Sequence, residues 1–279
     1  MKKISILAKS RRLHGLLADA VAMRECEIDP TFHGLSQTMI RGDMFMDAPE
    51  ERGAPKLEVV NGVAQIQVCG TLAMGLDECE KMSGLCDVND LDALLTQALA
   101  DPRCRVIALL MDSPGGSIQG IYELGERIRA ARAVKPVVAY SRSVCASAAY
   151  WLAAQASVIY AATTAVFGSI GIYAVLYDRS KMFEAAGVRP VLVKAGANKG
   201  AGIPGLPVTD EQAAAIQKRV DYVYGLFAAA VTAGRGGLVK AEDMDGSDWF
   251  AAEAAGRGLV DEILDSPAAV MAECQKLAR

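Results

Sequence analysis

The chain has 279 residues, of which 52% are hydrophobic and 22% are charged, and its formal net charge is −4. This balance is typical of a globular protein with a sizeable core, and the scattered basic residues exclude a nucleic-acid stripe or a membrane-surface helix. The seven cysteines form no C-x-x-C pair and have no histidine nearby, so we expect reduced thiols, no metal site and no cofactor.

Residues 1–55 are mixed in composition and end in the turn-like segment DAPEERGAP, so we expect an N-terminal arm or leader ahead of one domain at 56–279. The first residues begin like a signal peptide, but Lys9, Arg11 and Arg12 interrupt the apolar run before it reaches a useful length. We therefore expect a cytoplasmic protein without a membrane anchor.

The segment from residue 57 onward predicts an α/β fold. Two strand-like runs around Asn61-Gly62 predict a hairpin because both positions tolerate positive φ, and residues 88–100 have helical periodicity. Further strands are expected at 105–112, 136–140, 156–161 and 170–176, with helices at 117–133, 146–155, 181–186 and, after the start signal TDEQ, 209–233. Alternating strands and helices predict a largely parallel sheet.

The stretch from Ser143 to Tyr177 contains no charged residue, which suggests a membrane span as an alternative. Its serines, threonines and glycines argue against that alternative. A helix followed by two strands buried on both faces explains the stretch better, because such strands read as continuous apolar runs.

Two segments are candidates for chemistry. MDSPGGS at 111–117 follows a strand, and the N–H groups of its Gly115-Gly116 turn are suited to holding an oxyanion, although a plain strand-to-helix turn explains it equally well.

Ser147 lies among small residues at a helix start, where Oγ can reach a carbonyl and the Ala148 N–H can be a second donor. Its alternative role is an N-cap. Cys145 is a rival nucleophile, but no basic residue nearby would lower its pKa.

A serine nucleophile needs a base, and the two histidines, His14 and His33, both lie in the N-terminal arm. A lysine can serve if burial lowers its pKa by about 3 units, which costs about 4 kcal/mol. Lys199 lies in a glycine-rich window without an acid from Leu192 to Val208, whereas Lys194 ends an expected strand. On composition alone, a solvated loop lysine remains the better explanation for Lys199.

These motifs, in this order, resemble the signal peptide peptidase A family of serine peptidases, and most closely its phage and prophage branch of capsid (head maturation) proteases. The resemblance covers about residues 62–264. Its markers are GVAQIQVCGTL, MDSPGGS, KPVVAYSRSVCASAAYWLA, FGSIGIY and AGANKGAG. It implies a crotonase/Clp-like fold of repeated ββα units with a largely parallel sheet.

Carried over residue by residue, the resemblance makes Ser147 the nucleophile and Lys199 the general base, and it assigns the oxyanion donors to Gly115, Gly116 and Ala148. Ser169 matches a serine that orients the lysine, although a strand-turn serine is the alternative. The sequence departs from the family in having no membrane anchor and one catalytic half, and in placing Asn198 where a bulkier or basic residue is common.

The resemblance implies a serine endopeptidase with a Ser-Lys dyad that cleaves scaffold or capsid proteins during phage head maturation, in the host cytoplasm. It also implies a homo-oligomer, in which the lysine of one subunit can serve the serine of the next. The scattered basic residues lead us to expect no nucleic-acid partner. Three alternatives stay open: a cytosolic host peptidase that degrades signal peptides, an inactive capsid assembly subunit, and a relative that performs acyl-CoA chemistry.

Overall fold

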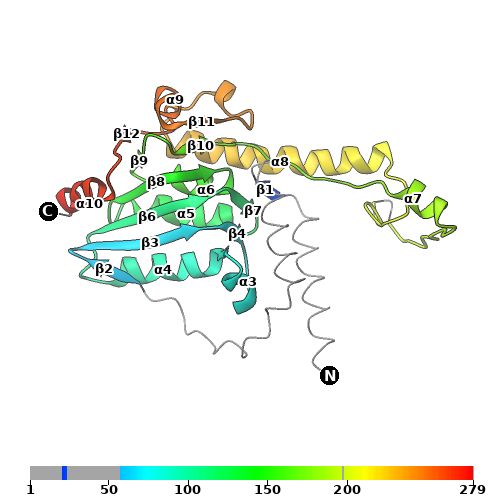
Figure 1. Ribbon diagram of the computed structural model, residues 1–279, viewed down its shortest axis with the longest axis horizontal. Helices are drawn as coiled ribbons and strands as arrows, with labels where there is room; N and C mark the ends of the chain where they lie inside the picture. The colour runs from blue at the N-terminus through cyan, green and yellow to red at the C-terminus, as the bar shows by residue number, and fades with distance from the viewer. Residues whose placement is uncertain (1–20, 24–56, 197, 279) are drawn as a thin grey trace. The chain divides into compact units, whose positions relative to one another are not determined.

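The computed structural model describes residues 21–23, 57–196 and 198–278 (Figure 1). The predicted arm at 1–55 lies outside the described residues except for the strand β1 (Val21–Met23). The described residues form two compact units: residues 57–171 with 226–278, called here the sheet unit, and residues 172–196 with 198–225, called the insert unit.

The sheet unit is built on a large, mostly parallel sheet (Figure 1). Its main path has the order β11-β10-β8-β6-β3-β2, and β9 pairs both with β8 and with β12. Only the β2/β3 and β10/β11 pairs of the described sheet are antiparallel. The strands are β2 (Glu58–Val60), β3 (Val63–Cys69), β6 (Val106–Ser113), β8 (Val137–Ala146), β9 (Val158–Ala161), β10 (Val166–Gly168), β11 (Asp248–Phe250) and β12 (Glu262–Ile263). The prediction of an α/β fold with a largely parallel sheet is confirmed.

A second, smaller sheet has the order β1-β7-β4-β5 and contains β4 (Thr71–Ala73), β5 (Leu85–Asp87) and β7 (Gly115–Ser117). β3 continues into β4, and β6 continues into β7, so the chain twice leaves the large sheet for the small one before it forms a helix. This succession is the predicted repeated ββα unit.

Helices cover both faces of the large sheet. Side chains of α4 (Val88–Ala100), α5 (Ile121–Ala131) and α6 (Ala148–Ala153) meet those of β3 and β6 around one small apolar space. On the other face, α10 (Pro267–Leu277) packs against β3, β6 and β8 in one buried cluster. Because both faces are covered, α6, β9 and β10 are largely buried, which explains the uncharged stretch. Shorter helices are α3 (Glu78–Met82), η2 (Ala241–Asp243) and α9 (Ala251–Gly256).

The insert unit contains α7 (Ser180–Ala185) and most of α8 (Asp210–Gly234), whose last residues belong to the sheet unit. Thr209 starts α8 with a reciprocal cap. Its Oγ1 accepts from the Gln212 N–H (3.3 Å), and its own N–H donates to Gln212 Oε1 (3.2 Å), which confirms the TDEQ signal. Within the sheet unit, the Phe227 ring of α8 stacks on Trp151 of α6 at 4.5 Å. Among the described helices, none is long and apolar enough to span a bilayer.

The strand predicted at 170–176 is wrong. The strand of this region is β10, which ends at Gly168, and residues 170–176 contain only an isolated bridge at Tyr173. Gly168 and Ser169 both have positive φ (124° and 53°), which ends the pleated backbone there. The strand expected to end at Lys194 is absent as well from the described residues 188–194. The pattern of apolar residues in the sequence did not indicate that strands would be absent at 170–176 and before Lys194.

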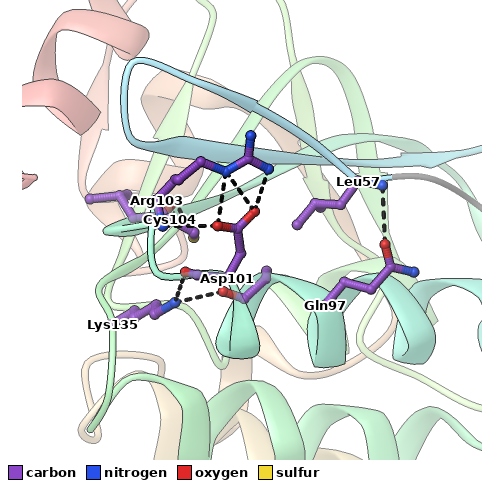
Figure 2. Close-up of polar contacts among 8 residues, drawn as sticks. Leu57, Gln97, Asp101, Arg103, Cys104 and Lys135 are labelled. Carbon is purple, nitrogen blue, oxygen red and sulfur yellow. Dashed lines mark hydrogen bonds and ion pairs between the residues drawn. The ribbon is translucent and has the colours of Figure 1, made fainter.

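The end of α4 is held by the Lys135 side chain and by the backbone N–H of Leu57, which lie in two other segments (Figure 2). The Lys135 ammonium donates to the carbonyl oxygens of Ala98 (2.7 Å) and Asp101 (2.9 Å), which have no partner within the helix ladder. The Leu57 N–H donates to Gln97 Oε1 (3.3 Å), so the first described residue before β2 is also attached to α4.

We predict that Lys135→Met lowers the free energy of unfolding by about 1–2 kcal/mol, because two helix-end carbonyls lose a charged donor. Urea unfolding followed by circular dichroism measures the change. Lys240→Met is the matched control, since the Lys240 side chain is 73% exposed and pairs only at the surface with Glu242. Equal stability of the two variants would contradict the capping role of Lys135.

Candidate active site

The site predicted from the sequence lies at the carboxyl ends of three parallel strands. Cys145 of β8 is paired with Ser113 of β6 on one side and with Phe167 of β10 on the other, and Ala146 is paired with Gly168. Parallel sheets bind ligands at this edge, because the strand ends leave backbone groups that the sheet does not pair. Ser147 is the next residue after β8.

Ser147 has a backbone conformation that is rare for a residue with a side chain. Its φ is 52° and its ψ is −125°, which costs about 1–3 kcal/mol and is typical of functional positions. Its N–H donates to the Gly168 carbonyl oxygen (2.8 Å), and its own carbonyl oxygen accepts from the Trp151 N–H (2.9 Å). The strain is thus maintained by the end of β10 and by the first turn of α6.

The Ser147 hydroxyl is buried and has no hydrogen-bond partner among the described residues. Ser147 occupies the N-cap position of α6, but its side chain makes no capping bond, so the N-cap role does not explain this serine. An unpartnered buried hydroxyl costs about 1–3 kcal/mol. The arrangement therefore leaves Oγ available to a base or a substrate.

The predicted oxyanion donors lie on two elements next to this serine, α6 and β7 (Gly115–Ser117). Ala148 is the first residue of α6, so its N–H is one of those without an acceptor inside the helix. β7, which contains Gly115 and Gly116, packs against α6. The Gly115 N–H donates to Ser113 Oγ (3.2 Å), so it already has a partner. Position 116 requires glycine because a Cβ there would lie 2.1 Å from the Leu72 carbonyl oxygen.

Ser169 follows β10 directly and shares the Gly168 turn with Ser147. Its φ is 53°, its side chain is largely buried, and its N–H donates to the Ser247 carbonyl oxygen (2.7 Å). The residues that precede β11 thus hold this turn in place. The structure therefore brings Ser147, Ala148 and Ser169 together at one strand edge.

Lys199 belongs to the insert unit, whereas Ser147 belongs to the sheet unit. It lies in the turn at 198–200, its side chain is exposed, and its N–H donates to the Gly196 carbonyl oxygen (3.2 Å). The Ser147–Lys199 pairing stays a prediction. His14 and His33 lie outside the described residues.

Cys145 is buried completely, and desolvation raises the pKa of its thiol far above the usual range. A protonated thiol is a poor nucleophile, so this burial argues against Cys145 as a rival to Ser147.

Sequence reasoning missed one polar contact at this edge. The Ser143 hydroxyl of β8 donates to the Asp112 carboxylate of β6, four residues before Ser147. The interaction depends on the register between two strands that are distant in sequence. Only the polar pattern Ser141-Arg142-Ser143 within an otherwise apolar run could have indicated it.

Comparison with known proteins gives a family and several relatives. Peptidase family S49 matches residues 129–278, just over half of the chain. The chain is 33% identical over 220 residues to the capsid assembly protease C of Escherichia phage lambda, covering 78% of this chain and 50% of the relative. It is 32% identical over 231 residues to the head-tail preconnector protein GP5 of Enterobacteria phage P21, covering 82% and 46%. The chain thus spans about half the length of these relatives.

Among solved structures, a putative enoyl-CoA hydratase/isomerase from Acinetobacter baumannii overlaps 80% of this chain and 82% of its own, with 17% identity and a TM-score of 0.46.

We predict that Gly116→Ala lowers the free energy of unfolding by about 2–4 kcal/mol, because the added methyl group overlaps the backbone of Leu72 and the positive φ of 156° disfavours a side chain. Thermal unfolding measures the loss. Gly256→Ala is the matched control, since a Cβ at position 256 meets no atom within 4 Å. A Gly116→Ala protein as stable as this control would show that β4 and β7 are not in contact as described.

Proposed function

Because the chain belongs to peptidase family S49, we propose that it is a serine endopeptidase in which Ser147 is the nucleophile and Lys199 the general base. The observation that carries the proposal is the Ser147 hydroxyl, which is buried without a partner on a strained backbone at the carboxyl ends of the strands. A purely structural role for this serine would not explain both the strained backbone and the buried hydroxyl without a partner, because each of them costs free energy.

The proposed reaction begins when the uncharged Lys199 amine removes the proton from Ser147 Oγ, which attacks the peptide carbonyl carbon. The Ala148 N–H and the N–H groups of Gly115 and Gly116 in β7 stabilise the tetrahedral oxyanion. The protonated lysine then gives its proton to the leaving amine, and water hydrolyses the acyl-enzyme. In this scheme the Gly115 N–H must leave Ser113 Oγ, or Gly116 must act alone beside Ala148.

Ser169 is proposed to orient the lysine. It follows Gly168, whose carbonyl oxygen holds the Ser147 N–H, so its position is coupled to that of the nucleophile. A hydroxyl in this place can accept a hydrogen bond from an ammonium or an amine. This bond would fix the direction from which Lys199 approaches Oγ.

The protein is proposed to act as a homo-oligomer in which Lys199 of one subunit serves Ser147 of another. Apolar side chains of the insert unit are exposed, and those of Val191 and Val193 are 80% and 92% exposed. The others are Val175, Tyr177, Met182, Val188, Leu192, Ile203 and Tyr222. Such an apolar surface supports contact with a second copy of the chain. It would also give Lys199 the dry surroundings that an uncharged amine needs.

The proposed substrates are the scaffold and capsid proteins of a phage head, cleaved in the host cytoplasm. The relatives support this choice by their own descriptions, a capsid assembly protease and a head-tail preconnector protein. An extended peptide segment with small or apolar residues near the cut suits the small side chains around Ser147.

We predict that Ser147→Ala and Lys199→Ala each lower the rate of casein cleavage by at least ~10³-fold, because each removes one member of the dyad. Release of labelled peptides measures the rate, and gel filtration checks that assembly is unchanged. Lys181→Ala is the matched control, since Lys181 is an exposed lysine of the same unit. Cleavage at the full rate by either dyad variant would overturn the proposed mechanism.

Mixing the two inactive variants tests where the dyad forms. We expect activity to return when Ser147→Ala and Lys199→Ala chains are unfolded together and reassembled, because mixed oligomers then contain an intact serine next to an intact lysine of another subunit. Separately reassembled variants are the control. If the mixture stays as inactive as its components, the dyad does not form between subunits.

A further inference from the structure

β8 contains a bulge three residues before the proposed nucleophile. Met111 of β6 is paired with Ser141 of β8, and the next pair is Ser113 with Cys145. One residue of β6, Asp112, therefore faces three residues of β8 at positions 142–144. A bulge of this kind bends its strand and changes the direction of the side chains that follow.

Hydrogen bonds from both strands hold this bulge. The Ser143 hydroxyl donates to Asp112 Oδ1 across the two strands, and the Ser143 N–H donates to Ser141 Oγ (3.3 Å). The Asp112 carbonyl oxygen accepts from the Gly70 N–H (2.9 Å), which fixes the residue that carries the carboxylate. Ser143 is thus attached to a part of β6 that is itself anchored.

Between Ser143 and Ser147 the chain has only Val144, Cys145 and Ala146. None of these side chains has a hydroxyl, an amide or a charge. The Asp112–Ser143 bond is therefore the last interaction between polar side chains in β8 before the nucleophile. These three residues are paired with β10, and the Ser147 N–H is bonded to Gly168, so a short paired segment joins the bulge to the nucleophile.

The pair is placed where it contributes little to global stability. The Asp112 side chain is exposed and Ser143 is half-buried, so water competes for the bond. A bond of this kind can nevertheless set the position of an atom. A displacement of about 1 Å at a reacting group is enough to lower a rate by up to about 100-fold.

We propose that Asp112 and Ser143 are a positioning pair, which sets the place of Ser147 Oγ through the bulge of β8. This proposal rests on the proposed role of Ser147 as the nucleophile. Neither side chain is proposed to touch the substrate. Their effect is on the reactivity of Ser147 and not on the affinity for the peptide.

The test measures two rates on the full chain: phosphonylation of Ser147 by a fluorophosphonate probe, and cleavage of fluorescently labelled casein. We expect Ser143→Ala to lower the phosphonylation rate and kcat by about 10-fold, while KM stays within about twofold. Ser143→Thr, which keeps the hydroxyl, should restore both rates to within about threefold. Asp112→Ala should match Ser143→Ala, and the double variant should be no slower than either, because one shared bond is lost.

Thr163→Val is the matched control, since it removes another hydroxyl–carboxylate bond of the sheet unit, from Thr163 Oγ1 to Asp265 (3.1 Å). It should leave both rates unchanged.

Unchanged rates in Ser143→Ala and Asp112→Ala, with Ser147 of the wild type still labelled, would overturn the positioning role alone. Absence of labelling in the wild type would instead remove the proposed function. If Ser143→Ala fails to fold, Asp112→Ala, which removes the acceptor and leaves Ser143 in place, decides the question by the same rates.

Discussion

The hydrogen bond from the Ser147 N–H to the Gly168 carbonyl oxygen is the contact on which the rest of the site depends. It extends the contact of β8 with β10 by one residue, to Ser147 itself, which has the strained φ of 52°. Because α6 begins at the next residue, the strand and the helix together determine where Oγ lies. Ser169 and the Ser247 carbonyl oxygen hold the other side of the Gly168 turn, so the strain at Ser147 is maintained by three separate segments of the chain.

Close backbone approach is the second constraint. Gly116 lies so near Leu72 that a side chain would overlap its carbonyl oxygen, and a Cβ at Gly168 would lie 2.6 Å from the Ser247 carbonyl oxygen. These contacts hold β7 beside β4, and the segment before β11 beside β10. In the proposed reaction, backbone N–H groups near these contacts would stabilise the oxyanion.

The sequence predicted best what local chemistry determines. Asn61-Gly62 forms the expected hairpin turn with φ values of 51° and 84°, the helix at 88–100 has the predicted bounds, and Thr209 caps α8 as TDEQ indicated. The strand at 170–176 was predicted wrongly because its apolar pattern does not show that the backbone turns at Ser169. The Asp112–Ser143 contact could not be predicted because it depends on the register of two strands, and the pairing of Lys199 with Ser147 remains a prediction from family resemblance.

The most direct test of the account is the site of covalent labelling by a fluorophosphonate, located by mass spectrometry of the intact chain and its peptides. The account predicts one adduct per chain, on Ser147, and its disappearance in Lys199→Ala but not in Lys181→Ala. Labelling of a different residue, or labelling of Ser147 at the same rate without Lys199, would contradict the claim that this lysine activates this serine.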